Sequence, residues 1–445
     1  MIDFGLMDLN NSIDMDSKDL DILYSAKEYK SRLLELITNA TSRIYITALY
    51  LQDDDAGREI MDALYKAKQN HPDLDIKIFV DAHRARRGLI GAKEQEGNRA
   101  FYLQKAKEFG VEIEVYGVAV KNKELFGVLH LKGMVFDNIL FFTGASINDI
   151  YLHQQQKYRL DRYYQFNNAG LADSFVKYLN QVFVHSELAP RLNKGEFPTL
   201  PELKKLILQL KHYLSNVEYK VPDESPSAAE LKVEPLVGFG KRRNSLNNKI
   251  RKLIQKSERS VVIFTPYFNL PKVLTRDVAK ALKRGVKIEI TVGDKTANDF
   301  FIHDDEKFST IGIVPYVYEI LLVRFAKRWK KYIDSGQLVI RLWKHEQNSY
   351  HLKGIIVDSR YHLVTGSNIN PRAWTLDLEN GLLIDDATKL LMPKVQPEID
   401  AIYKHTTIVE SYKQLDGIKD YPAKPQKLLN RIRMTQIDRI LKRLL

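Results

Sequence analysis

An internal duplication is the feature of this sequence that most constrains its fold. Residues 130–137 read His-Leu-Lys-Gly-Met-Val-Phe-Asp, and residues 351–358 read His-Leu-Lys-Gly-Ile-Ile-Val-Asp. The two copies stand 221 residues apart, about half of the 445-residue chain. Because a repeat at this separation implies two units of similar construction, we predict an α/β fold of two pseudo-twofold-related halves. Each half is expected to hold a mixed β-sheet flanked by helices, with one active site at the interface between the halves.

The composition along the chain predicts where the halves begin and end. Residues 37–50 and 254–267 share a second pattern, a polar helix end followed by a β-branched strand that closes on tyrosine. Residues 221–230 are rich in Pro, Ser and Glu, which is the composition of a linker. We therefore expect an N-terminal half over residues 1–215, a linker over 216–234, a C-terminal half over 235–425 and a basic amphipathic helix over 426–445.

The repeated His-x-Lys is the part of the motif that can carry chemistry. Residues i and i+2 of a strand point to the same face, so the histidine and the lysine of each copy project together. An ordinary strand face explains one such copy, but two copies with similar trailing residues favour a site. Two facing pairs suit a phosphodiester: one His attacks phosphorus, the other protonates the leaving oxygen, and the lysines offset charge. This scheme requires no metal and no other cofactor.

Further side chains are candidates to complete this site. Small residues after each copy let neutral donors approach a ligand, which nominates Ser146, Asn148, Ser367, Asn368 and Asn370 for substrate binding. Each histidine also needs a partner that selects its tautomer. Asp161 and Glu379 follow the two histidines at similar distances, 31 and 28 residues, so we predict them as the orienting carboxylates. The alternative for both is an ordinary surface charge.

The duplicated H-x-K-x4-D resembles the signature of the phospholipase D superfamily. The resemblance implies that both complete sets are catalytic, namely His130, Lys132, Asp137, His351, Lys353 and Asp358. Other stretches are similar to the phosphatidylserine synthase family of Gram-negative bacteria, among them residues 127–133, 265–271, 293–300, 370–374 and 376–380. This similarity extends over nearly the whole chain, from about residue 20 to the end.

The resemblance also implies a reaction, in which CDP-diacylglycerol and L-serine give phosphatidylserine and CMP. It implies a double displacement through a covalent phosphatidyl-histidine, carried out at the membrane surface. Precedent in the superfamily makes His130 the nucleophile and leaves His351 to protonate CMP and then to deprotonate serine. The residues alone do not distinguish these two roles.

An excess of positive charge predicts an anionic partner. Lys and Arg number 68 against 56 Asp and Glu, a net charge of +12, and residues 421–445 alone contribute +6. No charge-free run approaches the roughly 18–20 residues that span a bilayer. We therefore expect a cytoplasmic protein that associates peripherally with anionic phospholipid on the inner face of the cell membrane and requires no nucleic acid. The absence of cysteine excludes thiolate chemistry.

Two amphipathic segments are candidates for membrane contact. Residues 320–333, taken as a helix, gather apolar side chains on one side and basic ones on the other, with Leu321, Phe325, Arg328 and Trp329 as expected contacts. The C-terminal segment has a similar arc and contributes Lys442 and Arg443. The alternative for the first segment is a core-packed helix with a solvated basic face. The alternative for the second is docking on the protein body or on a second subunit.

Three basic residues in loops after predicted strands are further substrate-binding candidates. Arg84 and Arg87 belong to a cluster that could bind a diphosphate, and Lys295 could contact phosphate or cytidine. A solvated basic loop explains the arginines equally well.

Three other functions compete with the lipid transferase. A phospholipase D-type nuclease would need aromatic residues among the basic ones of a strand-binding groove, whereas the basic residues here lie on amphipathic faces. A cardiolipin synthase or a simple phospholipase is the second alternative, and a non-catalytic binding protein is the third. Two intact His–Lys–Asp sets argue against the last.

Overall fold

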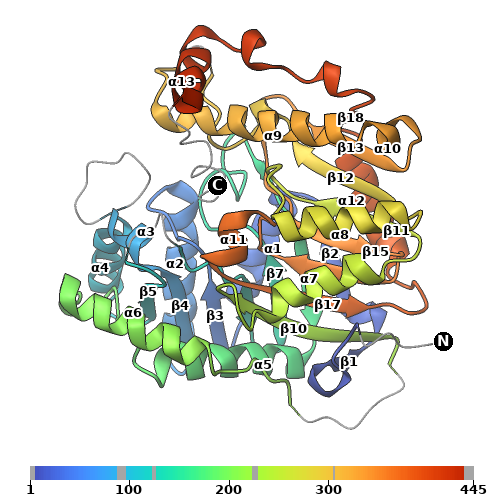
Figure 1. Cartoon of the computed structure of the whole chain (residues 1–445). Coiled ribbons are helices and arrows are strands. Elements are labelled where there is room, and N and C mark those ends of the chain that lie inside the picture. The colour runs from blue at the N-terminus through green and yellow to red at the C-terminus, as the bar shows by residue number, and fades with distance from the viewer. Residues whose placement is uncertain (1–5, 88–96, 123–126, 223–228, 304–305, 435–445) are drawn as a thin grey trace.

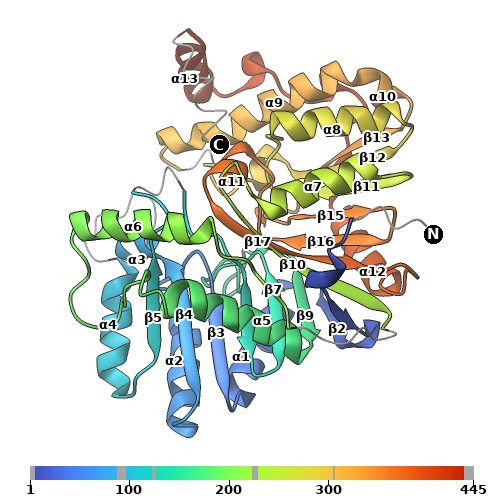
Figure 2. The same ribbon diagram turned by 60° about the horizontal axis from the view of Figure 1, so that its bottom comes forward.

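The predicted two-sheet α/β architecture is confirmed. The computed structural model describes residues 6–87, 97–122, 127–222, 229–303 and 306–434 (Figure 1). Two mixed sheets, each built mainly from one half of the chain, are flanked by helices and pack against each other (Figure 2).

The first sheet has seven strands in the order β2-β9-β7-β6-β3-β4-β5. Strands β3, β4 and β5 are parallel because helices carry the chain back between them, and the other neighbours are antiparallel. The strands are β2 (Leu20–Leu23), β3 (Arg43–Thr47), β4 (Asp75–Asp81), β5 (Glu114–Val118), β6 (Gly133–Phe136), β7 (Ile139–Thr143) and β9 (Tyr163–Asn167).

Helices cover both faces of this sheet, and polar caps start several of them. Ser25, Asp54 and Asn168 each accept a hydrogen bond from a backbone N–H in the first turn of α1, α2 and α5. The apolar sides of α1, α2 and α4 pack in one cluster, and α5 packs on the opposite face. The helices are α1 (Ala26–Asn39), α2 (Asp55–Asn70), α3 (Ala82–Arg87), α4 (Asn98–Phe109), α5 (Ala169–Leu179) and α6 (Leu200–Leu214), with a π-helical turn, η4 (Asn180–Val184), after α5.

The second sheet has nine strands in the order β1-β10-β17-β16-β15-β11-β12-β13-β18. The strands are β1 (Ile13–Met15), β10 (Leu231–Phe239), β11 (Ser260–Phe264), β12 (Lys287–Gly293), β13 (Leu338–Trp343), β15 (Gly354–Val357), β16 (Tyr361–Thr365), β17 (Leu378–Asp385) and β18 (Thr406–Ile408). The helices are α7 (Ser245–Lys256), α8 (Lys272–Lys283), α9 (Val314–Arg328), α10 (Lys330–Asp334), α11 (Pro371–Thr375), α12 (Met392–Tyr403) and α13 (Ala423–Met434).

The two sheets repeat one topology. In the first, β9-β7-β6-β3 are successively antiparallel and β3-β4-β5 are parallel; in the second, β17-β16-β15-β11 and β11-β12-β13 follow the same pattern. The second copy of the motif therefore enters its sheet at the same place as the first copy enters its own.

The halves are joined more closely than a linker between two independent units would require. Strand β1, from the N-terminal segment, pairs with β10 at the edge of the second sheet, and one hydrophobic cluster contains side chains of both halves. Residues 231–234, placed in the linker by composition, lie in β10, and α13 begins at Ala423, ahead of residue 426. Lys232 and Glu234 alternate with the buried Leu231 and Val233, so composition does not separate the start of β10 from a linker.

Candidate active site

Each motif delivers its histidine and lysine to the same edge of its sheet. Lys132 is followed directly by β6, whose first residue Gly133 pairs with Thr47 at the carboxyl end of β3. Gly354, after Lys353, pairs in the same way with Phe264 at the end of β11. The carboxyl ends of parallel strands are where α/β proteins place their sites.

Two β-bridges between the halves bring the two edges together. Leu129 bridges Leu378, and the short strands β8 (Arg159–Leu160) and β14 (Ser349–Tyr350) are parallel partners. The bridges are closed by backbone hydrogen bonds from His130 N to Leu378 O and from His351 N to Leu160 O, both 2.9 Å. The residue after each bridge is a motif histidine on one chain segment and a carboxylate on the other.

Each histidine is consequently held by the carboxylate of the opposite half. Glu379 Oε2 lies 2.8 Å from Nδ1 of His130, and Asp161 Oδ2 lies 3.1 Å from Nδ1 of His351. All four side chains are buried. Both predicted carboxylates thus lie beside the motif histidines, but each serves the histidine of the other copy. A carboxylate at Nδ1 selects the tautomer whose Nε2 is free to react.

The two lysines are buried, and each passes close to a glycine of the opposite half. Lys353 Nζ is 2.9 Å from Asp161 Oδ2, and Lys132 Nζ is 3.3 Å from the hydroxyl oxygen of Ser146. A Cβ added at Gly144 would stand 2.8 Å from Lys353 Nζ, and one at Gly366 would stand 2.5 Å from Lys132 Cγ. A side chain at Gly366 would meet Lys132, and one at Gly144 would meet first the carboxylate of Asp161, 2.5 Å away, and then Lys353, so both positions after β7 and β16 favour glycine.

Burial keeps both histidines neutral. Burial, followed by the charge of Lys132, holds the pKa of His130 well below its usual range. Burial and Lys353 lower the pKa of His351 to about 3, against the opposing pull of Asp161. A neutral imidazole has the lone pair that nucleophilic attack or base catalysis needs.

The pKa values of the lysines and of the carboxylates also differ from their usual ones. Burial and the neighbouring Lys353 lower the pKa of Lys132 to about 7. Burial would raise the pKa of Asp161, but Lys353 and His351 outweigh it and bring it to about 2. Burial raises the pKa of Glu379 to about 8, against the pull of Lys132. A phosphodiester bound between the lysines would supply the missing negative charge and raise the pKa of both lysines.

The motif aspartates do not belong to this centre, which corrects their assignment as catalytic residues. Asp137 lies in the turn between β6 and β7, where its carboxylate accepts backbone hydrogen bonds from Thr41, Ser42 and Arg43 at 2.8–3.0 Å. Asp358 accepts hydrogen bonds from the N–H groups of residues 258–260 in the equivalent turn. Each aspartate therefore ties the start of a central strand to the motif strand.

Replacing Asp137 with alanine should lower stability and leave catalysis intact. Burial raises the pKa of Asp137, but hydrogen bonds from Ser42 and Thr41 outweigh it and bring it to about 2, below the ordinary 3.8. Its stabilising effect is therefore present above pH 4 and is lost as the pH falls from about 4 to 2. We expect Asp137→Ala to lower the free energy of unfolding by about 1–2 kcal/mol at pH 7, measured by urea denaturation. An unchanged urea midpoint, or a large loss of kcat in the folded variant, would contradict this role; Asp73→Ala, at an exposed carboxylate, is the control.

The predicted amide and hydroxyl donors have mixed placements. Ser146 contacts Lys132, as expected for a residue of the site. Asn148 and Asn370 instead accept hydrogen bonds from the N–H of the third residue after them, so they cap the turns that follow. Ser367 is buried next to Gly366 and Asn368 is partly buried, and the hydroxyl of Thr265 donates to the backbone carbonyl of Asn368.

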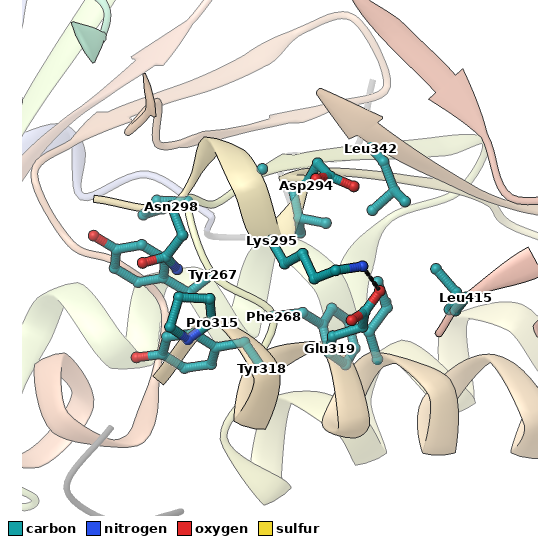
Figure 3. A pocket seen from close by; sticks show the side chains of 14 residues that line it. Tyr267, Phe268, Asp294, Lys295, Asn298, Pro315, Tyr318, Glu319, Leu342 and Leu415 are labelled. Carbon is teal, nitrogen blue, oxygen red and sulfur yellow. Dashed lines mark hydrogen bonds and ion pairs between the residues drawn. The ribbon is translucent and has the colours of Figure 1, made fainter. Parts of the chain in front are cut away.

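The basic residues predicted from loops to bind substrate also differ in where they lie. Arg84 lies in α3, with its guanidinium carbon 5.8 Å from the ring centre of Tyr50, and the side chain of Arg87 lies outside the described residues. Lys295 lines a pocket beside Tyr267, but its amine is 3.0 Å from Glu319 (Figure 3). The same amine is 2.6 Å from Asp416. Lys295 is therefore a structural ion-pair residue, because its ammonium group is already paired with two carboxylates.

The helix predicted to contact a membrane is packed on the protein itself. Its residues form α9 and α10, which meet at Trp329. Phe325 is buried with its ring 4.7 Å from that of Phe268, while Leu321 and Trp329 pack at the margin of the same core. The apolar arc therefore faces inward, and the assignment of Leu321, Phe325 and Trp329 to a membrane surface is wrong. Arg328 stands over the ring of Trp329.

The second membrane candidate cannot be placed, since Lys442 and Arg443 lie outside the described residues. Across the part of the chain that the structure describes, no helix has both the length and the apolar character needed to cross a bilayer.

Arg159 and Asp299, a charged pair near His351, were not predicted from the sequence. The hydroxyl of Tyr151 lies 2.8 Å from Nδ1 of His351, and the guanidinium carbon of Arg159 stands 4.9 Å from the ring centre of Tyr151. Asp299 lies 3.8 Å from Arg159 and accepts a hydrogen bond from the hydroxyl of Tyr267. The only signal in the sequence was position, since Tyr151 follows the first motif and Asp299 follows a strand end.

Two His–Lys pairs on duplicated α/β units, each histidine held by a carboxylate, define a phospholipase D-type centre. Comparison with known proteins agrees: the family model described as "Cardiolipin synthase, PLD-like domain" matches residues 33–150 and 250–404. The chain is 45% identical to the CDP-diacylglycerol–serine O-phosphatidyltransferase of Escherichia coli, over 96% of this chain and 94% of that protein. It is 41% identical to the enzyme of the same name from Haemophilus influenzae, over 97% and 96% of the two chains.

A solved structure extends this likeness to three dimensions. The crystal structure of phosphatidylserine synthase from Haemophilus influenzae superposes with a TM-score of 0.94 at 40% identity, covering 98% of each chain. The chain therefore belongs to the phospholipase D-like superfamily, in the family of these CDP-diacylglycerol–serine O-phosphatidyltransferases.

Proposed function

We propose that this protein is a CDP-diacylglycerol–serine O-phosphatidyltransferase that forms phosphatidylserine and CMP through a covalent phosphatidyl-histidine. The observation that carries the proposal is the pair of buried, neutral histidines, each held by a carboxylate, together with the two buried lysines of the same motifs. Two relatives that match nearly the whole chain bear the name of this enzyme.

The proposed chemistry uses the two histidines on opposite sides of phosphorus. Nε2 of His130 attacks the phosphorus that carries diacylglycerol, and the bond to the CMP oxygen breaks in line. His351 then removes the proton of the serine hydroxyl as its oxygen attacks, and the P–N bond to His130 breaks. Lys132 and Lys353 offset the charge on the non-bridging oxygens throughout.

The proposal is tested with purified protein, CDP-diacylglycerol in mixed micelles and EDTA, followed by CMP and by lipid product with and without L-serine. Serine-dependent phosphatidylserine is the expected result. CMP release with only phosphatidic acid would indicate a hydrolase, and no turnover would direct attention to other phosphodiesters, nucleic acid included.

We further propose that the enzyme works peripherally on the cytoplasmic surface of the cell membrane and that helix α6 contacts the lipid. Leu203 and Ile207 of α6 pack on Ala82 and Ala119, which directly follow β4 and β5 at the active-site edge of the first sheet. Two other leucines of α6 are exposed, Leu200 by 67% and Leu208 by 68%. Lys204, Lys205 and Lys211 are exposed on the same helix. Exposed leucines among lysines match the chemistry of an anionic bilayer.

Substituting these leucines should weaken membrane binding without unfolding the protein, because both side chains are already largely in solvent. We expect Leu200→Ser/Leu208→Ser to lower the affinity for vesicles containing phosphatidylglycerol about tenfold, measured by co-sedimentation. Leu390→Ser is a matched control, since Leu390 is 41% exposed on the other half. Wild-type binding by the double variant would refute the role of α6.

A further inference from the structure

The side of the active site next to His351 must receive the acceptor, if the double displacement proposed above is correct. In-line attack by His130 expels CMP on the opposite side, and the acceptor then enters where CMP has left. His351 is the base on that side. Groups that recognise the acceptor should therefore lie around His351 and not around His130.

Four polar side chains lie there, which we call the acceptor cluster: Tyr151, Arg159, Tyr267 and Asp299. Tyr151 is 2.8 Å from Nδ1 of His351, and its ring is covered by the guanidinium of Arg159. The ring centre of Tyr267 is 6.2 Å from that of His351, and its hydroxyl donates to Asp299. Tyr267 is itself fixed by stacking on Tyr318, with ring centres 5.0 Å apart (Figure 3).

The charged pair of the cluster is loosely joined and partly open. Arg159 Nη1 and Asp299 Oδ2 are 3.8 Å apart, longer than a hydrogen bond, and their side chains remain 12% and 16% exposed. Nε of Arg159 donates to the hydroxyl of Ser349 at 3.1 Å, while Nη1 is the atom that faces Asp299. Opposite charges held just beyond hydrogen-bond distance can accept a ligand that carries both charges.

The duplication is informative here, because the charge of Arg159 is not repeated in the other half. Arg159 lies two residues before Asp161, and the equivalent position before Glu379 is Asp377. Asp377 accepts a hydrogen bond from Val128 N at 2.9 Å and pairs with Arg372 at 3.3 Å. The histidines and lysines are repeated in kind, whereas the charge two residues before each carboxylate is reversed. Such asymmetry fits a task performed on one side of the phosphorus only.

A carboxylate beside a phosphodiester site also requires an explanation of its own. Asp299 would repel an anionic lipid phosphate, so its presence favours a ligand with a positive group. L-Serine carries an ammonium and a carboxylate on the carbon next to its hydroxymethyl group. An arginine fork suits the carboxylate, and an aspartate suits the ammonium.

We propose that Arg159 and Asp299 form the binding site for the acceptor amino acid, Arg159 taking its carboxylate and Asp299 its ammonium, with the hydroxyl directed at His351. The hydroxyl oxygen then forms a bond to phosphorus, its proton passes to Nε2 of His351, and the electron pair of the broken P–N bond returns to His130. Tyr267 acts as a positioning residue because its hydroxyl holds Asp299.

Acceptors that lack one charge test this assignment. 3-Hydroxypropionate is serine without the ammonium, and ethanolamine is serine without the carboxylate. We expect Asp299→Asn to raise the KM for L-serine at least about tenfold and to reduce the preference for L-serine over 3-hydroxypropionate by a similar factor. Arg159→Gln should reduce the preference for L-serine over ethanolamine instead. Tyr267→Phe should shift the preference in the same direction as Asp299→Asn, by a smaller factor.

The ratio between two acceptors is measured within one variant, so partial loss of folded enzyme cancels. Asp334→Asn, at an exposed carboxylate on α10, is the control and should match the wild type. Unchanged acceptor preferences in both cluster variants would overturn the proposal, whatever happens to the rate. A raised KM for CDP-diacylglycerol with an unchanged KM for serine in Arg159→Gln would also overturn it and indicate a diphosphate site. If the wild type releases no CMP from CDP-diacylglycerol, it is the proposed function that fails.

Discussion

His130→Ala is expected to abolish both CMP release and phosphatidylserine formation, with a fall in kcat of at least about 10⁴-fold, because no nucleophile remains. His351→Ala should behave differently. CMP leaves as a phosphate whose second pKa is about 6, so its departure needs little help from an acid. The serine hydroxyl, by contrast, cannot attack efficiently without a base. This variant should therefore release close to one equivalent of CMP in a burst and then stop.

The two variants are compared by rapid quench with lipid labelled at phosphorus, followed by denaturing electrophoresis. Label should remain on the His351→Ala protein and be missing from the His130→Ala protein. His71→Ala, at an exposed residue after α2, is the control and should turn over like the wild type. Label on His130→Ala and none on His351→Ala would mean that the two roles are exchanged.

The second large effect concerns the carboxylates that cross between the halves. An amide in place of a carboxylate favours the wrong tautomer of the histidine and costs on the order of 10²–10⁴-fold in kcat. Because Glu379 holds His130, Glu379→Gln should slow the CMP burst although it lies in the second half of the chain. Asp161→Asn should preserve the burst and slow transfer to serine, since Asp161 holds His351 and also Lys353.

Stopped-flow detection of CMP combined with steady-state phosphatidylserine formation separates these two steps. Glu35→Gln, at a carboxylate 54% exposed on α1, should leave both steps unchanged. The opposite assignment, with Asp161→Asn slowing the burst and Glu379→Gln sparing it, would show that each carboxylate serves its own half.

Local spacing was sufficient to predict the reactive pairs. His130 and Lys132 stand at i and i+2, so the geometry of one extended segment places them together whatever the rest of the chain does. The repeat of this spacing also predicted two similar sheets, and both lie as expected with the motifs at equivalent edges.

The sequence predicted a residue's role less accurately where that role depends on a partner far away in the chain. The spacing of Asp137 in the motif suggested chemistry, but its contacts are with backbone N–H groups about 95 residues earlier in the chain. The apolar arc of α9 indicated that this side of the helix is shielded from water. The arc alone could not distinguish shielding by a bilayer from packing on the protein's own core.

The amino-acid sequence therefore determined the residue types of the site, their duplication and the α/β class, since these depend on short-range geometry and on repetition. Only the tertiary structure decided which carboxylate holds which histidine, because Glu379 and His130 are 249 residues apart and meet beside the bridge between Leu129 and Leu378. It also decided that Arg159 and Asp299 share one side of the site, since charges from two different halves become neighbours only after the sheets have packed.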